Sequence, residues 1–121
     1  MKGTSTITMA RSFGSTIIER IGNTPLVRLD RLTEHLPGVQ IVGKAEWYNP
    51  GGSVKDRAAS SIVLDAERRG LLHFSRKPGG RGLLDATSGN TGIAYAMLGA
   101  ALGFRVTPCM PSNVSEERKR Y

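Results

Sequence analysis

Apolar residues in this chain recur in short runs separated by turns rich in glycine and proline, and the spacing within each run predicts its secondary structure. From residue 53 the apolar side chains recur every three or four positions until Gly70, which predicts an amphipathic helix. The apolar face of this helix would consist of Ala58, Ala59, Ile62, Val63 and Ala66. Residues 93–102 are apolar on nearly every side, so we predict a helix that is buried all round and ends at Gly103.

Shorter apolar runs predict strands. They lie at 26–29, 40–45, 82–86 and 105–110. Short helices are expected at 15–21, capped by Ser15, and from Ser115 onward. From residue 40 strands and helices alternate, which is typical of a parallel sheet with right-handed crossovers. We therefore predict an α/β fold in which helices flank a parallel sheet, with Pro108 at an edge, a bulge or an early strand end because proline lacks a backbone donor.

Two turns follow predicted strands and open predicted helices. Residues 49–57 read Asn-Pro-Gly-Gly-Ser-Val-Lys-Asp-Arg, and residues 87–92 read Thr-Ser-Gly-Asn-Thr-Gly. Ligands of open α/β folds bind at the carboxyl ends of the strands. Both turns are therefore expected at one edge of the sheet.

The first turn places a lysine at the start of a helix. Ser53 and Asp56 fit the Ser-x-x-Asp helix-start pattern, which predicts Ser53 as N-cap and Lys55 in the first turn. The positive end of the helix dipole favours the neutral amine there, and a neutral amine forms a Schiff base with an aldehyde such as that of pyridoxal phosphate. An ordinary capped helix with a solvated lysine fits the same local pattern.

The second turn has the composition of an anion site. Its backbone N–H groups and the dipole of the following helix favour negative charge. Hydroxyl and amide donors are supplied by Thr87, Ser88, Asn90 and Thr91. A carboxylate fits better than a triphosphate, because the chain lacks the glycine-lysine motif of nucleotide sites and the glycine pattern of dinucleotide sites. A plain helix-capping turn is the alternative.

These two turns, together with residues 21–29 (Ile-Gly-Asn-Thr-Pro-Leu-Val-Arg-Leu), resemble the cysteine synthase and cystathionine beta-synthase family. That family comprises fold type II pyridoxal-phosphate enzymes, which are tryptophan synthase beta-like, and the resemblance runs from about residue 15 to residue 120. It implies that Lys55 binds the cofactor and acts in catalysis. It further implies that the substrate carboxylate is held by Thr87, Ser88, Asn90 and Thr91, and that Asn90 also contacts the cofactor.

The resemblance implies a cysteine synthase, a pyridoxal-phosphate-dependent transferase or lyase that replaces the acetate of O-acetyl-L-serine with sulfide and releases L-cysteine. A cystathionine beta-synthase, a related pyridoxal-phosphate lyase and a truncated, catalytically silent chain are the alternatives. Family members are much longer and expected to be homodimers, and their glycine-rich loop for the cofactor phosphate would lie outside this chain. We therefore expect a flexible tail at 1–14 and an incomplete cofactor-binding α/β domain at 15–121.

The charge of the chain narrows the classes of partner that it could bind. The net charge of +7 and pI near 10.2 suggest nucleic-acid binding, but the cations are scattered, and no zinc-finger or helix-turn-helix pattern is visible. We expect no nucleic-acid partner and no membrane association, since no apolar run could cross a bilayer.

Cys109 alone cannot form an internal disulfide and is expected in the core of a cytoplasmic protein. His35 and His73 lack metal-ligand spacing, so no metal site is expected.

Overall fold

The computed structural model describes residues 16–75 and 79–120, without the side chain of residue 118. The expected flexible tail at 1–14 and the Ser15 cap lie outside these residues. Among the helices of the described ranges, none combines the length and the apolar composition needed to cross a bilayer.

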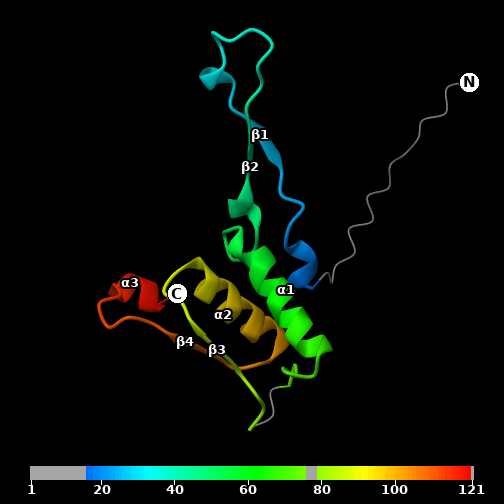
Figure 1. Cartoon of the computed structure of the whole chain (residues 1–121), viewed down its shortest axis with the longest axis vertical. Helices are drawn as coiled ribbons and strands as arrows, with labels where there is room; N and C mark the ends of the chain where they lie inside the picture. The colour runs from blue at the N-terminus through cyan, green and yellow to red at the C-terminus, as the bar shows by residue number, and fades with distance from the viewer. Residues whose placement is uncertain (1–15, 76–78, 121) are drawn as a thin grey trace, which may run out of the picture.

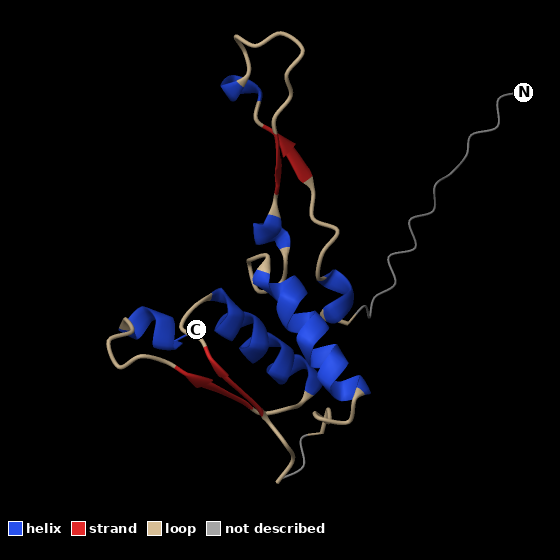
Figure 2. Cartoon of the chain, viewed as in Figure 1, coloured by secondary structure: helices blue, strands red, loops and turns tan. Residues whose placement is uncertain are grey.

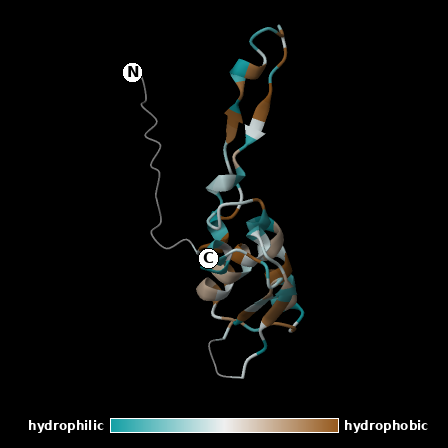
Figure 3. Cartoon of the chain, turned by 90° about the vertical axis from the view of Figure 1, so that its left-hand side faces the viewer, coloured by the Kyte–Doolittle hydropathy of each residue, from teal (hydrophilic) through white to brown (hydrophobic). Residues whose placement is uncertain are grey.

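The N-terminal third of the described chain forms an extended hairpin. Strand β1 (Leu26–Arg28) pairs with β2 (Val42–Lys44) in antiparallel register, with Val27 opposite Gly43. The short 3-10 helix η2 (Asp30–Leu32) lies between them in the chain. Figure 1 shows that this hairpin extends away from the longer helices, and Figure 3 shows its strands coloured mainly as apolar residues.

Two further 3-10 helices flank the hairpin where it joins the body. Helix η1 (Ile18–Arg20) precedes β1, and η3 (Glu46–Tyr48) follows β2. The predicted helix at 15–21 is thus a single 3-10 turn among the described residues. The predicted strand at 40–45 is shorter than expected. Helix η3 leads from it into the turn at residues 49–57, which contains Lys55 and is called the lysine turn below.

The body of the molecule contains three helices and a pair of strands (Figure 2). In chain order they are α1 (Lys55–Arg68), β3 (Leu83–Ala86), α2 (Asn90–Leu102), β4 (Val106–Cys109) and α3 (Glu116–Arg120). Strands β3 and β4 are parallel and are joined through α2, as a crossover unit requires. Helix α2 lies between α1 and this strand pair (Figure 1).

The core forms where α1, α2 and the strand pair meet. Its buried side chains are Ala59, Val63, Leu72, Ala94, Tyr95, Leu98 and Phe104. The ring of Phe74 stacks on that of Phe104, with centroids 5.8 Å apart, and closes the end of the cluster. Close packing also depends on Gly99, where a Cβ atom would lie 2.6 Å from Val106 Cγ2 and 2.9 Å from the Phe104 carbonyl oxygen. These contacts fix α2, and with it the loop that opens it, against β4.

The α/β class is confirmed, but one strand does not pair as predicted. Strand β2 was expected beside the later strands in one parallel sheet, whereas it pairs with β1 in a separate antiparallel ladder. The lysine turn therefore reaches the body through the packing of α1 on α2. Pro108 lies within β4, opposite Asp85. Among the described strands β4 pairs with β3 alone, so it is an edge strand, a position where proline is tolerated.

Three burial predictions were wrong. On α1, Ala58 and Ile62 are exposed because the face toward α2 is centred on Ala59 and Val63. Helix α2 is buried on one face only, since Ala96 and Ala100 are exposed. Cys109 is exposed at the end of β4 rather than buried in the core.

Leu98 is the side chain whose truncation should destabilise this core most clearly. It is fully buried on α2, so Leu98→Ala is expected to lower the free energy of unfolding by about 2–5 kcal/mol through lost burial and the cavity left behind. Leu84→Ala is the matched control, because Leu84 is 70% exposed on β3. Chemical denaturation measures both, and equal losses for the two variants would contradict the placement of the core.

Candidate functional site

Helix α1 begins at Lys55. The residue before it, Val54, is the N-cap and has helical dihedral angles, so the predicted N-cap at Ser53 is wrong. The Ser53 hydroxyl still contributes, because its Oγ accepts a hydrogen bond from the Lys55 backbone N–H at 3.2 Å. Lys55 therefore occupies the first helical position, one step earlier than predicted.

Asp56 reaches back across the glycine turn. Its side chain is fully buried, and Oδ2 accepts a hydrogen bond from the Gly51 backbone N–H instead of from Ser53. Among the described residues Oδ1 has no hydrogen-bond partner. Burial raises the pKa of the Asp56 carboxyl, and the hydrogen bond from Gly51 opposes that shift. The carboxyl group thus fixes the glycine turn against the first turn of α1.

A polar cluster lies behind the lysine turn. Arg57, in the first turn of α1, donates through Nε to Glu46 Oε2 and through Nη2 to Glu46 Oε1, both at 2.9 Å. Thr24 and Asn49 add hydrogen bonds to the same carboxylate at 3.0 and 2.8 Å. The hydrogen bonds and charge of Arg57 lower the pKa of Glu46 to about 2, and the pair raises the pKa of Arg57.

The loop after β3 is tied to both neighbouring elements. The Thr87 backbone N–H donates to the Cys109 carbonyl at 3.0 Å, which joins the loop to the end of β4. The Gly92 N–H donates to the Thr87 hydroxyl at 3.0 Å and to the Gly89 carbonyl at 2.9 Å. Helix α2 begins at Asn90, three residues before the predicted start, so most of the loop is the N-terminus of the helix itself. The helix dipole therefore acts directly on this loop.

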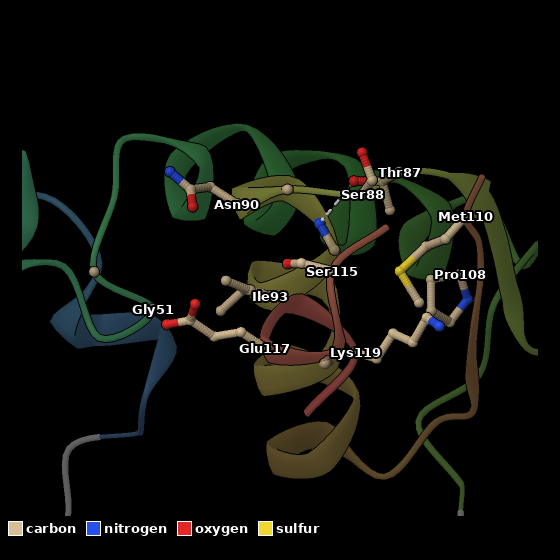
Figure 4. Close-up of a pocket in the computed structure, with 14 residues that line it drawn as sticks. Gly51, Thr87, Ser88, Asn90, Ile93, Pro108, Met110, Ser115, Glu117 and Lys119 are labelled. Atoms are coloured by element: carbon tan, nitrogen blue, oxygen red, sulfur yellow. Dashed lines mark hydrogen bonds between the residues drawn. The ribbon is translucent and has the colours of Figure 1, made fainter. Parts of the chain in front are cut away.

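A pocket of about 570 Å³ opens between the two turns (Figure 4). Its volume lies in the range typical of small-molecule sites. Residues from the lysine turn, the Thr87 loop, α2, β4 and α3 line it: Gly51, Gly52, Thr87, Ser88, Gly89, Asn90, Gly92, Ile93, Ala96, Pro108, Met110, Ser115, Glu117 and Lys119. Two turns that are about 35 residues apart in the sequence thus face one cavity, as predicted from their place in the chain.

Not every predicted site residue lines this pocket. Thr87, Ser88 and Asn90 do, whereas Thr91 and Lys55 are not among the lining residues. Lys55 is exposed, and its amine makes no hydrogen bond or ion pair within the described ranges. Gly51 and Gly52, which precede it, form part of the wall. The Lys55 side chain is therefore unconstrained by other described residues, one turn of chain after two residues of the pocket wall.

Several lining residues were missed from the sequence. Pro108 and Met110 lie at the carboxyl end of β4, the same edge as the Thr87 loop, and the strand-end rule could have found them. Glu117 and Lys119 come from α3, the helix expected from Ser115 onward, to which no site residue was assigned. Figure 4 shows the Glu117 carboxylate on the side of Gly51 and the Lys119 side chain extending toward Pro108.

The lining suits a ligand that has a flat apolar part and an anionic group. Ile93, Ala96 and Met110 provide apolar surface, while the Thr87 loop provides hydroxyl, amide and helix N-terminal donors. The side chains of Ser88 and Asn90 make no hydrogen bonds to other described residues and so remain available to a ligand. No group of three or more metal-ligating side chains gathers anywhere in the described ranges. Pyridoxal phosphate, an aldehyde on a flat ring with an anionic substituent, has both of these features and is a group that a lysine amine can hold covalently.

Comparisons with known proteins agree with this chemistry. A family model described as "Pyridoxal-phosphate dependent enzyme" matches residues 17–121. A cysteine synthase of Aquifex aeolicus is 55% identical over 112 residues, covering 91% of this chain and 33% of that protein. The crystal structure of a cysteine synthase from Entamoeba histolytica superposes with a TM-score of 0.80 at 42% identity, over 98% of this chain and 35% of that one.

A second activity appears among the similar structures. The crystal structure of an O-ureido-L-serine synthase has a TM-score of 0.76 at 48% identity, and covers 88% of this chain and 32% of that one. The present chain thus spans about a third of the length of the relatives it matches.

Proposed function

Because this chain belongs to the family of pyridoxal-phosphate dependent enzymes, we propose that it carries the cofactor lysine and the substrate-carboxylate loop of a cysteine synthase. The proposed reaction replaces the acetate of O-acetyl-L-serine with sulfide and yields L-cysteine. Residues 15–121 would be the part of the cofactor-binding α/β domain that supplies these two elements. The small-molecule substrates and a homodimeric complete enzyme belong to the same proposal.

One observation supports the proposal above the others. The glycine turn that leads into Lys55 and the Thr87–Asn90 loop line the same pocket. An amine that holds the cofactor and donors that hold a carboxylate must face one ligand for chemistry at the intervening α-carbon. That the two turns line one cavity although they open separate helices supports such an arrangement.

Lys55 is proposed to hold pyridoxal phosphate covalently through its amine. With the substrate bound, the Lys55 amine would be the base that accepts the proton from the substrate α-carbon. Pyridoxal phosphate, when bound, supplies an electron sink for the negative charge that this proton transfer leaves. The bond from Cβ to the acetate oxygen would then break, sulfide would form the new bond to Cβ, and the protonated Lys55 amine would return the proton to the α-carbon.

The Thr87 loop is proposed to fix the substrate through its carboxylate. Ser88 and Asn90 offer unpaired polar side chains in the lining, and Thr87 and Thr91 contribute from the same turn. Asn90 also begins α2, so its backbone N–H lies at the positive end of the helix dipole. This site binds the part that all amino-acid substrates share, and it leaves the choice of leaving group to other contacts.

The activity itself is tested by supplying the protein with pyridoxal phosphate, O-acetyl-L-serine and sulfide and measuring the products. Cysteine and acetate in equal amounts are expected. A parallel assay supplies serine and homocysteine, and their consumption with O-acetyl-L-serine untouched would instead indicate a cystathionine beta-synthase. No turnover of either substrate pair would contradict an enzymatic role for this chain and favour the silent alternative.

The carboxylate site is tested by Asn90→Ala. We expect the dissociation constant for O-acetyl-L-serine to rise roughly ten- to a hundredfold, because hydrogen bonds to a charged group contribute more than neutral ones. Asn113→Ala is the matched control, since Asn113 is exposed and does not line the pocket. Titration followed by the cofactor absorbance measures both variants. Equal affinities would remove Asn90 from the substrate site.

A further inference from the structure

Both ends of the segment that carries Lys55 bind the carboxylate of Glu46. Asn49, immediately before the segment, donates through Nδ2 to Glu46 Oε2 at 2.8 Å and to the Glu46 carbonyl at 2.7 Å. Arg57, immediately after it, forms the bidentate pair with the same carboxylate. Residues 50–56 therefore form a loop whose two ends meet at one side chain.

A third segment of the chain shields this junction. The Thr24 hydroxyl donates to Glu46 Oε1 at 3.0 Å and accepts from Arg57 Nη2 at 3.2 Å. The Gly22 backbone N–H donates to Asn49 Oδ1 at 2.8 Å, and Thr24 and Asn49 are almost fully buried. Gly22 has a φ of +86°, and a Cβ atom there would lie 2.8 Å from Arg57 Nη1. The guanidinium thus lies close to the Gly22 backbone.

The Lys55 amine depends on this junction, together with the Gly51–Asp56 hydrogen bond inside the segment, because the Lys55 side chain has no described partner of its own. The lysine side chain is exposed and has no partner within the described ranges, so the backbone alone decides where the amine can reach. Gly51 and Gly52 lie in the same loop and form part of the pocket wall. A loop released at either end would therefore displace the amine and the wall together.

We propose that Glu46 is a positioning residue, which acts through Asn49 and Arg57 to present the Lys55 amine to the pocket. Glu46 does not line the pocket. The inference rests on the proposed role of Lys55, and it adds a residue whose effect on cofactor attachment is indirect. Neither the motif containing Lys55 nor the loop at Thr87 includes it.

The variant Glu46→Gln tests this role with little change of size. An amide replaces one carboxylate oxygen with a donor, and every side chain around Glu46 (Arg57, Thr24 and Asn49) also donates. In one of these contacts two donors therefore face each other, and that hydrogen bond is lost. Asp65→Asn is the matched control on the same helix, because Asp65 pairs with Arg68 and Arg69 at the far end of α1.

Two measurements follow, and the first needs no cofactor. Hydrogen exchange of the amides at 51–57 should become about tenfold faster or more in Glu46→Gln and stay unchanged in Asp65→Asn. Titration with pyridoxal phosphate, followed by its visible absorption, should then show about tenfold weaker attachment in Glu46→Gln alone. Chemical denaturation of both variants provides the correction for any general loss of stability.

The outcomes separate the two proposals. Unchanged exchange at 51–57, or unchanged cofactor attachment in a variant that is otherwise folded, would overturn the role of Glu46. Equal defects in Asp65→Asn would do the same, since they would reflect only the stability of α1. If the exchange result is as expected but unmodified protein attaches no cofactor at Lys55, the proposed function fails, whereas the fixing of the turn by Glu46 is supported.

Discussion

Replacing Lys55 by alanine is expected to abolish covalent retention of pyridoxal phosphate and to reduce any turnover of O-acetyl-L-serine by roughly 10²–10⁴-fold or more, the usual contribution of a positioned general base. Stability should hardly change, because the Lys55 side chain is exposed and has no partner among the described residues. Visible absorption after gel filtration measures the retained cofactor, and denaturation confirms that the variant folds.

Lys119→Ala is the control for this experiment. Lys119 lines the pocket from α3, so its amine could compete with that of Lys55 for the cofactor. In the structure it forms an ion pair with Glu116 at 2.6 Å. Its removal should leave covalent retention intact. If retention is instead lost in Lys119→Ala and kept in Lys55→Ala, the cofactor is attached to Lys119 and the proposed mechanism is wrong.

Gly51→Ala is expected to have the second largest effect, through the shape of the lysine turn. A Cβ atom at Gly51 would lie 2.9 Å from both Cγ and Oδ2 of Asp56, a side chain that is fully buried and cannot swing into solvent. The alanine must therefore displace Asp56 or break the hydrogen bond from the Gly51 N–H to Oδ2. Overpacking of this kind costs about 1–3 kcal/mol.

The matched control for Gly51→Ala is Gly89→Ala. A Cβ atom at Gly89 meets nothing within 4 Å, and the φ of −137° is open to any residue. Denaturation should show a larger loss for Gly51→Ala than for Gly89→Ala, where the only cost is a poorer N-cap residue for α2, and the Gly51 variant should also attach pyridoxal phosphate more weakly. If the two variants are equally stable, Asp56 does not hold the turn as described.

The positions of the two turns could be predicted from the sequence, although for a reason that was partly wrong. Local patterns located α1 and α2 and the turns that open them, because glycine and helix-start residues act over a few positions. Which strand pairs with which is decided by contacts far along the chain. The alternation of strands and helices along the chain suggested one sheet that includes β2. In the structure β2 is only three residues long and pairs with β1 instead.

The polar junction at Glu46 could not be predicted from local patterns. Thr24 and Arg57 are 33 residues apart and each is unremarkable in its own segment, so no spacing rule connects them. The same limit applies to Asp56, which fits the helix-start pattern with Ser53 and yet bonds to Gly51. Side chains that bridge segments become visible only when the backbone brings those segments together.

The most direct test of the Lys55 assignment is to identify the residue that carries the cofactor. The protein is equilibrated with pyridoxal phosphate, reduced with borohydride to make the attachment permanent, digested and mapped by mass spectrometry. A single modified peptide with the label on Lys55 is expected. A label on Lys119 instead, or one spread over several lysines, would contradict the assignment.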